Sequence, residues 1–355
     1  MKFGFVVGRL DPNNSCFQAR VIRPNDELRA MGVDSRILDE NSPTDALRDC
    51  DVLVFHRAPW RVREVRGRGI VIGFDLADDL FASSYTRLGA DFLITDSLPN
   101  ARFYLSPNTY YWLHGFPDKT GLEPAPAAET RFVWCGSPEN LHTLVGAPLE
   151  ALEEVGRTHP ISLRIITNTR AHTEKWLGKL PRIEARNFRI EWLPFAQETH
   201  EALMQECDVG LFPQAMHLER WRKKSMYKPS HAASLGLPAI CSPTEEVSMN
   251  FTHGSNALLP QDSADWVTAV RTMTDGAQRT RIRANVLELY RTRFTLRLAA
   301  QQMLTIARCE LRRSREQRFR TLRRFSLRVY VMAEKLMDAV QRRLARRTAS
   351  PQGKP

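Results

Sequence analysis

A short predicted helix with cationic residues at its start lies in the segment Lys223–Pro243, KKSMYKPSHAASLGLPAICSP. Pro229 suits the first turn of this helix, because proline lacks a backbone N–H and has a preset φ. Gly236 can adopt the left-handed conformation that ends a helix, and Pro238 prevents the helix from continuing. The apolar residues 238–241 then predict a short buried strand.

The start of this predicted helix is suited to bind an anion. The first turn of a helix leaves backbone N–H groups unpaired and carries a partial positive charge. Four residues with ammonium or hydroxyl groups surround it: Lys223, Lys224, Ser225 and Lys228. Together these features predict a phosphate site. A solvated basic loop before an ordinary helix is the alternative that these residues leave open.

Two polar residues in the first half of the chain end predicted buried strands. The apolar runs 50–55 and 69–74 are followed by His56 and Asp75. Ligands of parallel sheets bind beyond the carboxyl ends of the strands. We therefore expect His56 and Asp75 to be catalytic or acceptor-binding residues, with Asp75 acting on an acceptor hydroxyl. A structural histidine and a helix-capping aspartate are the alternatives.

The acidic residues Asp75, Asp78 and Asp79 also raise the question of a metal site. Carboxylates are suitable ligands for a divalent ion. The cationic helix start makes such an ion redundant, since lysines would neutralise a diphosphate in its place. We therefore predict no metal, and we expect Asp78 and Asp79 to cap the helix that follows them.

The elements that must position these residues follow an alternating order. Apolar runs of strand length alternate with helical stretches, which predicts parallel sheets covered by helices on both faces. The predicted fold class is α/β, with two Rossmann-like doubly wound domains facing across a cleft. The expected units are a domain at 1–120, a linker at 121–130, a domain at 131–308 and a basic helical tail at 309–355. Strands are expected at 2–7, 33–38, 50–55, 69–74, 90–95 and 110–113, and then at 132–135, 162–166, 188–192, 207–212 and 238–241.

The segment 223–243 resembles the donor site of GT-B glycosyltransferases of the group 1 (family 4-like) type. In that family a helix presents its N-terminus to the diphosphate of a nucleotide sugar. The residues that match its close are Ala233, Gly236, Pro238 and Ser242, and those that match a Lys-Ser pair and a second Lys upstream are Lys224, Ser225 and Lys228. The two glutamates usual in this segment are replaced by Lys223 and His231.

The resemblance covers roughly residues 2–307 and implies a donor site in the second domain. Gly136 and Ser137 lie where the family has a phosphate-facing loop, and Pro194 and Phe195 lie where it holds the nucleobase. The resemblance also implies that the configuration of the transferred sugar is retained. The donor-binding residues expected are Gly136, Ser137, Pro194, Phe195, Lys224, Ser225, Lys228, His231 and Glu246, the last with plain loop charge as its alternative.

These observations predict a metal-independent glycosyltransferase. It would move a sugar from a nucleotide diphosphate sugar to a hydroxyl of a glycan or a lipid-linked glycan. The nucleotide sugar is a co-substrate, and no other cofactor is expected. A non-catalytic nucleotide- or glycan-binding module on the same fold is one alternative, and a sugar-nucleotide epimerase is another.

Charge and cysteine content predict where the protein works. The net charge is +11, and residues 309–355 hold 14 Lys and Arg against 4 Asp and Glu. Six scattered cysteines and the lack of a long apolar run predict a reduced, cytoplasmic protein.

The tail has one apolar stripe on an arginine-rich helix, which could pack on the protein, pair with another helix or lie on an anionic membrane surface. Nucleic-acid binding is disfavoured. The stripe consists of Leu322, Phe325, Val329, Met332, Leu336 and Ala339.

Overall fold

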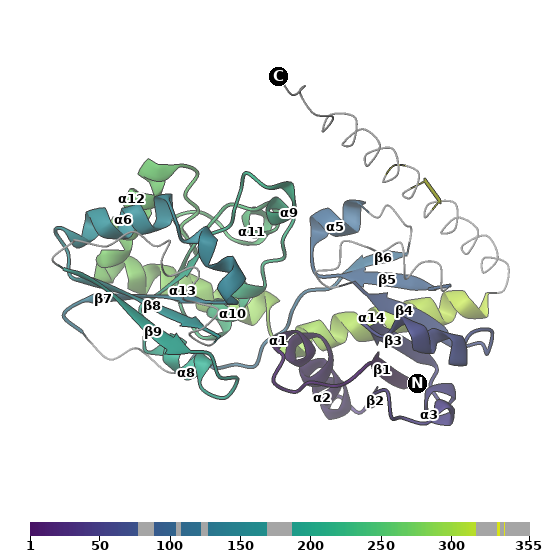
Figure 1. The fold of residues 1–355 in the computed structure, drawn as a ribbon. Helices are drawn as coiled ribbons and strands as arrows, with labels where there is room; N and C mark the ends of the chain where they lie inside the picture. The colour runs from purple at the N-terminus through teal and green to yellow at the C-terminus, as the bar shows by residue number, and fades with distance from the viewer. Residues whose placement is uncertain are drawn as a thin grey trace, which may run out of the picture.

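A computed structural model describes residues 1–76, 89–103, 108–121, 127–168 and 187–316, together with 332, 333 and 337. It consists of two lobes, each built around one sheet (Figure 1). The predictions for Asp78, Asp79 and the apolar stripe of the tail lie largely or wholly outside the described residues.

The first lobe has a six-stranded sheet in the order β2-β1-β3-β4-β5-β6. Each pair of neighbouring strands is parallel. The order reverses between β1 and β3, so the chain winds outward from this point in both directions. The strands are β1 (Lys2–Val7), β2 (Asp34–Leu38), β3 (Val52–His56), β4 (Val71–Asp75), β5 (Phe92–Thr95) and β6 (Thr109–Tyr111).

The second lobe has a five-stranded sheet in the order β11-β10-β7-β8-β9, and its neighbouring strands are also parallel. Its order reverses between β7 and β10. The predicted α/β architecture of two doubly wound parallel sheets is thus confirmed. The strands are β7 (Thr130–Cys135), β8 (Ile161–Thr167), β9 (Phe188–Pro194), β10 (Val209–Phe212) and β11 (Ala239–Cys241).

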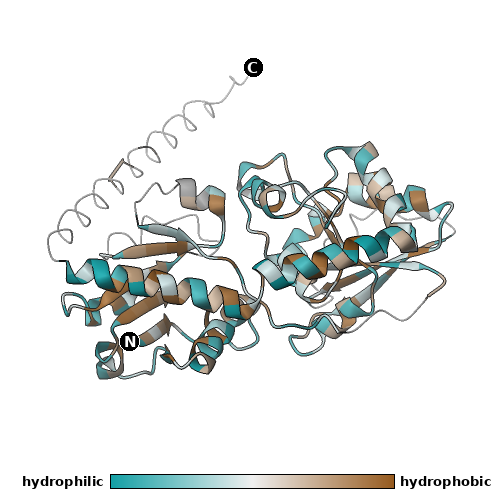
Figure 2. Ribbon diagram, turned by 180° about the vertical axis from the view of Figure 1, so that it is seen from behind, coloured by the Kyte–Doolittle hydropathy of each residue, from teal (hydrophilic) through white to brown (hydrophobic). Residues whose placement is uncertain are grey.

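Helices cover the faces of both sheets (Figures 1 and 2). The first helical stretch is continuous from 15 to 30 and includes a π-helical turn at Gln18–Ile22. In the first lobe the α-helices are α1 (Ser15–Phe17), α2 (Arg23–Ala30), α3 (Thr44–Arg48) and α5 (Leu98–Phe103). Then follow α6 (Ala147–Gly156), α8 (His200–Gln205), α9 (Glu219–Arg222), α10 (Tyr227–Ser234), α11 (Glu245–Asn250), α12 (Ser263–Thr274), α13 (Gly276–Arg293) and α14 (Leu296–Arg315).

Alternate residues of the central strands enter different cores, which explains their continuous apolar runs. In β1, Phe5 and Val7 belong to the core on one face of the sheet, and Val6 belongs to the core on the other. All three side chains are fully buried. Strands buried on both faces need apolar residues at every position, whereas half-exposed strands need them only at every second one.

Helix α14 returns from the second lobe to the first, which the sequence analysis did not predict. The sequence alone predicts that residues up to 308 belong to the second domain and the remainder to the tail. In the structure, Ala300 and Met303 of α14 pack in the core that contains Phe3 and Phe5. The indole of Trp112 donates a 2.9 Å hydrogen bond to a carbonyl of α14. The helix therefore packs its apolar face over the sheet of the first lobe, although the second lobe directly precedes it in the sequence (Figure 1).

The two crossings between the lobes run side by side. The backbone N–H of Phe116 donates to the carbonyl of Phe294 at 2.9 Å, and Leu296 N–H donates to the carbonyl of Phe116 at 3.1 Å. The hydroxyl of Tyr290 donates to the same Phe116 carbonyl. The lobes are thus joined by two segments of the polypeptide that are hydrogen-bonded to each other.

Within the part of the chain that the structure describes, no helix combines the length and the apolar character required to cross a bilayer.

Candidate functional site

Helix α10 has the local structure that the sequence predicts. It begins at Tyr227, which places Pro229 in its first turn. At its end Gly236 has a φ of 67°, in the left-handed region. Leu237 N–H donates to the carbonyl of Ala232 and Gly236 N–H to that of Ala233, the hydrogen-bond pattern of a Schellman motif. This stop turns the chain directly into β11.

A cavity of about 340 Å³ lies between the two lobes, at the carboxyl ends of both sheets. Both reversals of strand order face it, which is where ligands of doubly wound sheets bind. From the first lobe it is lined by Ser15, Cys16, Asp96 and His114. From the second it is lined among others by Gly136, Ser137, Phe195, Lys224, Ser225, Lys228 and His231.

Most of the predicted donor-binding residues therefore come together, and two do not. Pro194 ends β9 and is exposed. Glu246 is fully buried beside the cavity rather than in its lining. Its carboxylate accepts hydrogen bonds from the backbone N–H of Leu98, at 2.7 Å, and from the hydroxyl of Tyr111. Because both partners belong to the first lobe, Glu246 links the two lobes.

Lys228 has the most unusual environment among the cations of the cavity. Its ammonium lies 4.6 Å from the centre of the Trp134 ring and forms no ion pair with a carboxylate among the described residues. Burial lowers the pKa of Lys228 to about 8, and the neighbouring Lys224 acts in the same direction. A cation desolvated in this way lacks a counter-ion, which an anionic ligand would supply.

The glycine at position 136 makes room for this ammonium. A Cβ at Gly136 would collide with Lys228 Nζ and would lie 3.0 Å from the ring of Trp134. The position directly follows β7, so the chain turns away from the sheet beside the cavity. Ser137, which comes next, donates a hydrogen bond to Glu139. Of the Gly-Ser pair predicted from the resemblance, Gly136 thus lies against the lysine.

The two predicted catalytic residues form a fully buried chain with an arginine. His56 Nδ1 lies 3.0 Å from Asp75 Oδ2, and Arg20 donates to both oxygens of Asp75 at 2.9 and 2.6 Å. Burial raises the pKa of Asp75, but Arg20 and His56 outweigh it and hold that pKa far below its ordinary value. Neither His56 nor Asp75 lines the cavity; Cys16, whose Sγ lies 3.6 Å from His56 Nε2, does.

A second histidine–aspartate pair does line the cavity, and the sequence analysis gave it no role. His114 Nε2 lies 3.0 Å from Asp96 Oδ2. Within the described residues, Asp96 Oδ1 and His114 Nδ1 are buried and make no hydrogen bond. Burial raises the pKa of Asp96, but His114 and Arg20 outweigh it and lower that pKa. The signal available in the sequence was that Asp96 directly follows a predicted strand.

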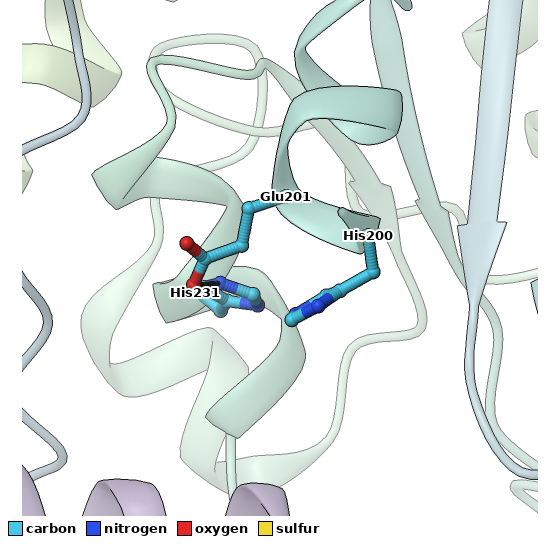
Figure 3. A group of neighbouring side chains, drawn as sticks. All are labelled: His200, Glu201 and His231. Atoms are coloured by element: carbon cyan, nitrogen blue, oxygen red, sulfur yellow. Dashed lines mark hydrogen bonds and ion pairs between the residues drawn. The ribbon is translucent and has the colours of Figure 1, made fainter. Parts of the chain in front are cut away.

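His200, Glu201 and His231 are close enough to consider as metal ligands (Figure 3). Their ligand atoms lie within 4.8 Å of one another. The Glu201 carboxylate, however, already contacts His231 Nε2 at 2.9 Å, Arg23 at 3.2 Å and the ammonium of Lys119. Burial raises the pKa of Glu201, but these partners lower it far below its ordinary value.

The donor set therefore fits a metal ion poorly. Two permanent cations already neutralise the carboxylate and would repel a third. His200 Nδ1 lies 3.0 and 3.1 Å from the carbonyls of Gln197 and Ala196, so it donates its proton there and the ring is tied to the turn before α8. The cluster instead joins the lobes, since Arg23 and Lys119 come from outside the second sheet.

Comparisons with known proteins identify structural relatives. No family model and no curated protein matches the chain. A crystal structure of HepE from Anabaena in complex with UDP and glucose is similar, with a TM-score of 0.60, 13% identity, and coverage of 86% of this chain and 98% of that one. An α-glucosyltransferase in complex with UDP-glucose and DNA containing an abasic site has a TM-score of 0.62, 10% identity, and coverage of 86% and 99%. A glycosyltransferase from Rickettsia africae has a TM-score of 0.65, 11% identity, and coverage of 87% and 98%.

At this level of identity the likeness concerns the fold. The chain has the predicted GT-B fold of two Rossmann-like lobes facing across a cleft. Membership of the group 1 type stays a prediction.

Proposed function

We propose that the protein is a glycosyltransferase that uses a nucleotide diphosphate sugar. The observation that carries the proposal is the desolvated ammonium of Lys228, which lies at the start of α10 beside Gly136 in the cavity between the lobes. The structural relatives with UDP or UDP-glucose bound support the nucleotide-sugar class of donor.

In the proposed reaction the second lobe binds the donor. The diphosphate lies against Lys224, Ser225 and Lys228, and the sugar points toward the first lobe. Negative charge grows on the diphosphate as the glycosidic bond breaks. Two lysines fixed before the reaction stabilise that charge, which in such transfers is typically a large part of catalysis. His231 contributes to the wall beside them, through a ring held by Glu201.

The acceptor would enter along the first lobe, where Asp96 and His114 line the cavity. If Asp96 accepts the proton on His114 Nε2, then Nδ1 carries a lone pair that can accept a hydrogen bond from an acceptor hydroxyl. The predicted catalytic pair His56 and Asp75 stays a prediction, and Cys16 separates it from the cavity. A glycan or lipid-linked glycan is the acceptor class that we propose.

Binding of UDP and uridine to the full chain, measured by calorimetry, tests the donor site. Lys224→Ala and Lys228→Ala should each weaken UDP binding by about tenfold or more and leave uridine binding nearly unchanged, because a charge-assisted contact contributes roughly 1.5–3 kcal/mol. Lys223→Ala is the matched control, since that ammonium already pairs with Glu219 at 2.6 Å. Wild-type UDP affinity in both test variants would refute the donor site.

Turnover separates the proposal from its rivals. Release of UDP from UDP-glucose, with or without an acceptor, supports a transferase, and it should persist in EDTA if no metal takes part. Tight binding without turnover supports a non-catalytic module. Conversion of the sugar without release of UDP supports an epimerase.

We further propose that the basic tail brings the enzyme to an anionic membrane surface, where lipid-linked acceptors are found. Each basic residue near such a surface contributes about 1 kcal/mol, and added salt weakens the attraction. Full-length protein should sediment with anionic liposomes at low salt, and a chain ending at 316 should not. The cut is placed there because α14 extends to Arg315 and belongs to the first lobe. Equal behaviour of the two chains would refute a membrane role for the tail.

A further inference from the structure

Cys16, His56 and Asp75 form a linear chain of polar contacts that ends at the cavity. Cys16 Sγ lies 3.6 Å from His56 Nε2, and His56 Nδ1 lies 3.0 Å from Asp75 Oδ2. The three residues come from the start of α1, the end of β3 and the end of β4. A thiol, an imidazole and a carboxylate in this order are the components of an activated cysteine nucleophile.

The protonation of His56 follows from its contact with Asp75, at the buried end of this row of three residues. Arg20 donates to both oxygens of Asp75, so the carboxylate is ionised and acts only as an acceptor. His56 must then carry its proton on Nδ1, which leaves a lone pair on Nε2 toward Cys16. Phe17 packs edge-on against the His56 ring at 5.3 Å and helps to fix its orientation. The imidazole is thus held as a base directed at the thiol.

Cys16 is the accessible member of these three residues. It lines the cavity and is partly exposed, whereas His56 and Asp75 are buried. It also lies in the first turn of the helical stretch 15–30, where Asn14 accepts a hydrogen bond from its backbone N–H. A helix N-terminus favours a thiolate.

The other cysteines lack this environment. Cys50, Cys207 and Cys241 are buried, and burial raises the pKa of Cys50 to about 11 and that of Cys207 to about 12. Cys135 lines the same cavity, but burial raises its pKa to about 11. Cys309 is partly exposed, on α14.

We propose that Cys16 is a nucleophilic thiol, activated by His56 and Asp75, at which small electrophiles entering the cavity form a covalent adduct. With a haloacetamide, the sulfur–carbon bond forms as the carbon–halogen bond breaks; halide leaves, and the thiol proton passes to His56. With a hydroperoxide, the sulfur attacks the distal oxygen and the O–O bond breaks. The sulfur is oxidised to a sulfenic acid while the peroxide is reduced, and the proton held by His56 completes the departing water or alcohol.

This site does not depend on the proposed transfer reaction. An adduct on Cys16 would occupy space in the cavity between the lobes, so the modification would block whatever binds there.

Limited alkylation of the native full-length protein tests the proposal. The protein is treated with iodoacetamide at pH 7 without nucleotide, and the labelling of each cysteine is followed by peptide mass spectrometry. Cys16 should react at least about tenfold faster than Cys309 and Cys135. Hydrogen peroxide followed by a sulfenic-acid trap should mark the same cysteine first. Labelling of Cys309 at an equal or higher rate would overturn the proposal.

The dependence of the rate on pH tests the role of His56. The charged or titratable groups that face Cys16 or His56 include Arg20 on the same helical stretch, Asp75 on β4 and Tyr227 on α10. The wild-type rate should change little between pH 7 and pH 8, because His56 takes up the thiol proton as the sulfur attacks, so the reaction does not wait for a thiolate formed by solvent. In His56→Gln the rate at pH 7 should fall by about tenfold and should rise with pH, as for an ordinary thiol of pKa about 8.5. If that variant does not fold, the wild-type profile decides alone: a tenfold rise over this pH unit refutes activation by His56.

Discussion

At the scale of single residues, the ammonium of Lys228 is the group on which the proposed donor site depends most. It is desolvated between Trp134 and Gly136, and burial lowers its pKa to about 8. As the pH rises, the affinity of the protein for a diphosphate should therefore decrease at pH values at which an ordinary lysine is still charged.

We expect UDP affinity to fall by about tenfold between pH 7 and pH 9 in wild type, because Lys228 loses its proton above pH 8 while the diphosphate stays fully ionised. Calorimetric titrations across this range measure the change. Lys228→Arg is the control, since a guanidinium stays charged throughout. An equally steep loss of affinity in that variant would show that another group titrates.

Gly136→Ala should also weaken UDP binding by about tenfold or more, because the added methyl group displaces the ammonium of Lys228. The thermal midpoint should fall only modestly, since Lys228 can move its flexible side chain into the open cavity and the ring of Trp134 need shift by only a few tenths of an ångström. Gly276→Ala is the matched control, because a Cβ there meets no atom closer than 3.8 Å. Wild-type UDP affinity in Gly136→Ala would contradict this account of the site.

The residues of the proposed donor site that could be predicted from the sequence are neighbours along the chain. Lys224, Ser225 and Lys228 could be predicted because a helix start and the cations beside it are local features. The contacts of Glu246 could not be predicted, since its partners Leu98 and Tyr111 are more than 130 positions away in sequence. Pairing across such separations is decided by how the lobes dock and leaves no periodic signal.

At the scale of elements, the strands could be predicted better than the helix that completes the first lobe. Residues buried on both faces of a sheet produce continuous apolar runs, which are visible in any single strand. The helix α14 has an ordinary amphipathic pattern, which shows that one face is buried but not against which sheet. The short helix α11 was not predicted either, although Thr244 caps it by accepting a hydrogen bond from Val247 N–H.

Met303→Ala should lower the free energy of unfolding by about 2–5 kcal/mol, because this fully buried residue of α14 packs in the core of the first lobe. Thermal or denaturant unfolding measures the loss. Leu298→Ala on the same helix is the control. The side chain of Leu298 is 38% exposed, so its removal should lower the free energy of unfolding by less than about 0.5 kcal/mol. Similar losses in the two variants would show that α14 does not pack on the sheet in solution.

At the scale of the whole molecule, the arrangement of the lobes depends on a few buried polar contacts. Glu246 accepts from Leu98 and Tyr111, and the Ser97 hydroxyl donates to the carbonyl of Lys223 at 2.7 Å. Burial raises the pKa of Glu246, although Tyr111 and Leu98 oppose this. A buried carboxylate that loses one of its donors is destabilised by roughly 1–3 kcal/mol or more.

Tyr111→Phe should therefore loosen the contact between the lobes. Small-angle scattering should show a larger radius of gyration than in wild type, and the thermal midpoint should fall. Tyr110→Phe is a matched control, because the hydroxyl of Tyr110 donates to Glu310 of α14 within the first lobe. That variant should lose stability without any change in the radius of gyration. Identical scattering from Tyr111→Phe and wild type would rule out this role for Glu246.

The return of α14 to the first lobe has a consequence for how the protein is made. Phe3 and Phe5 leave the ribosome long before Met303, which packs in the same core. Synthesis proceeds at about 5–20 residues per second, so roughly 10–40 s separate the end of the first sheet from the arrival of this helix. During that interval one face of the nascent sheet stays uncovered. The first lobe to be synthesised is therefore the last to be completed, and a chaperone that shields its apolar face should bind most strongly to chains stalled before residue 296.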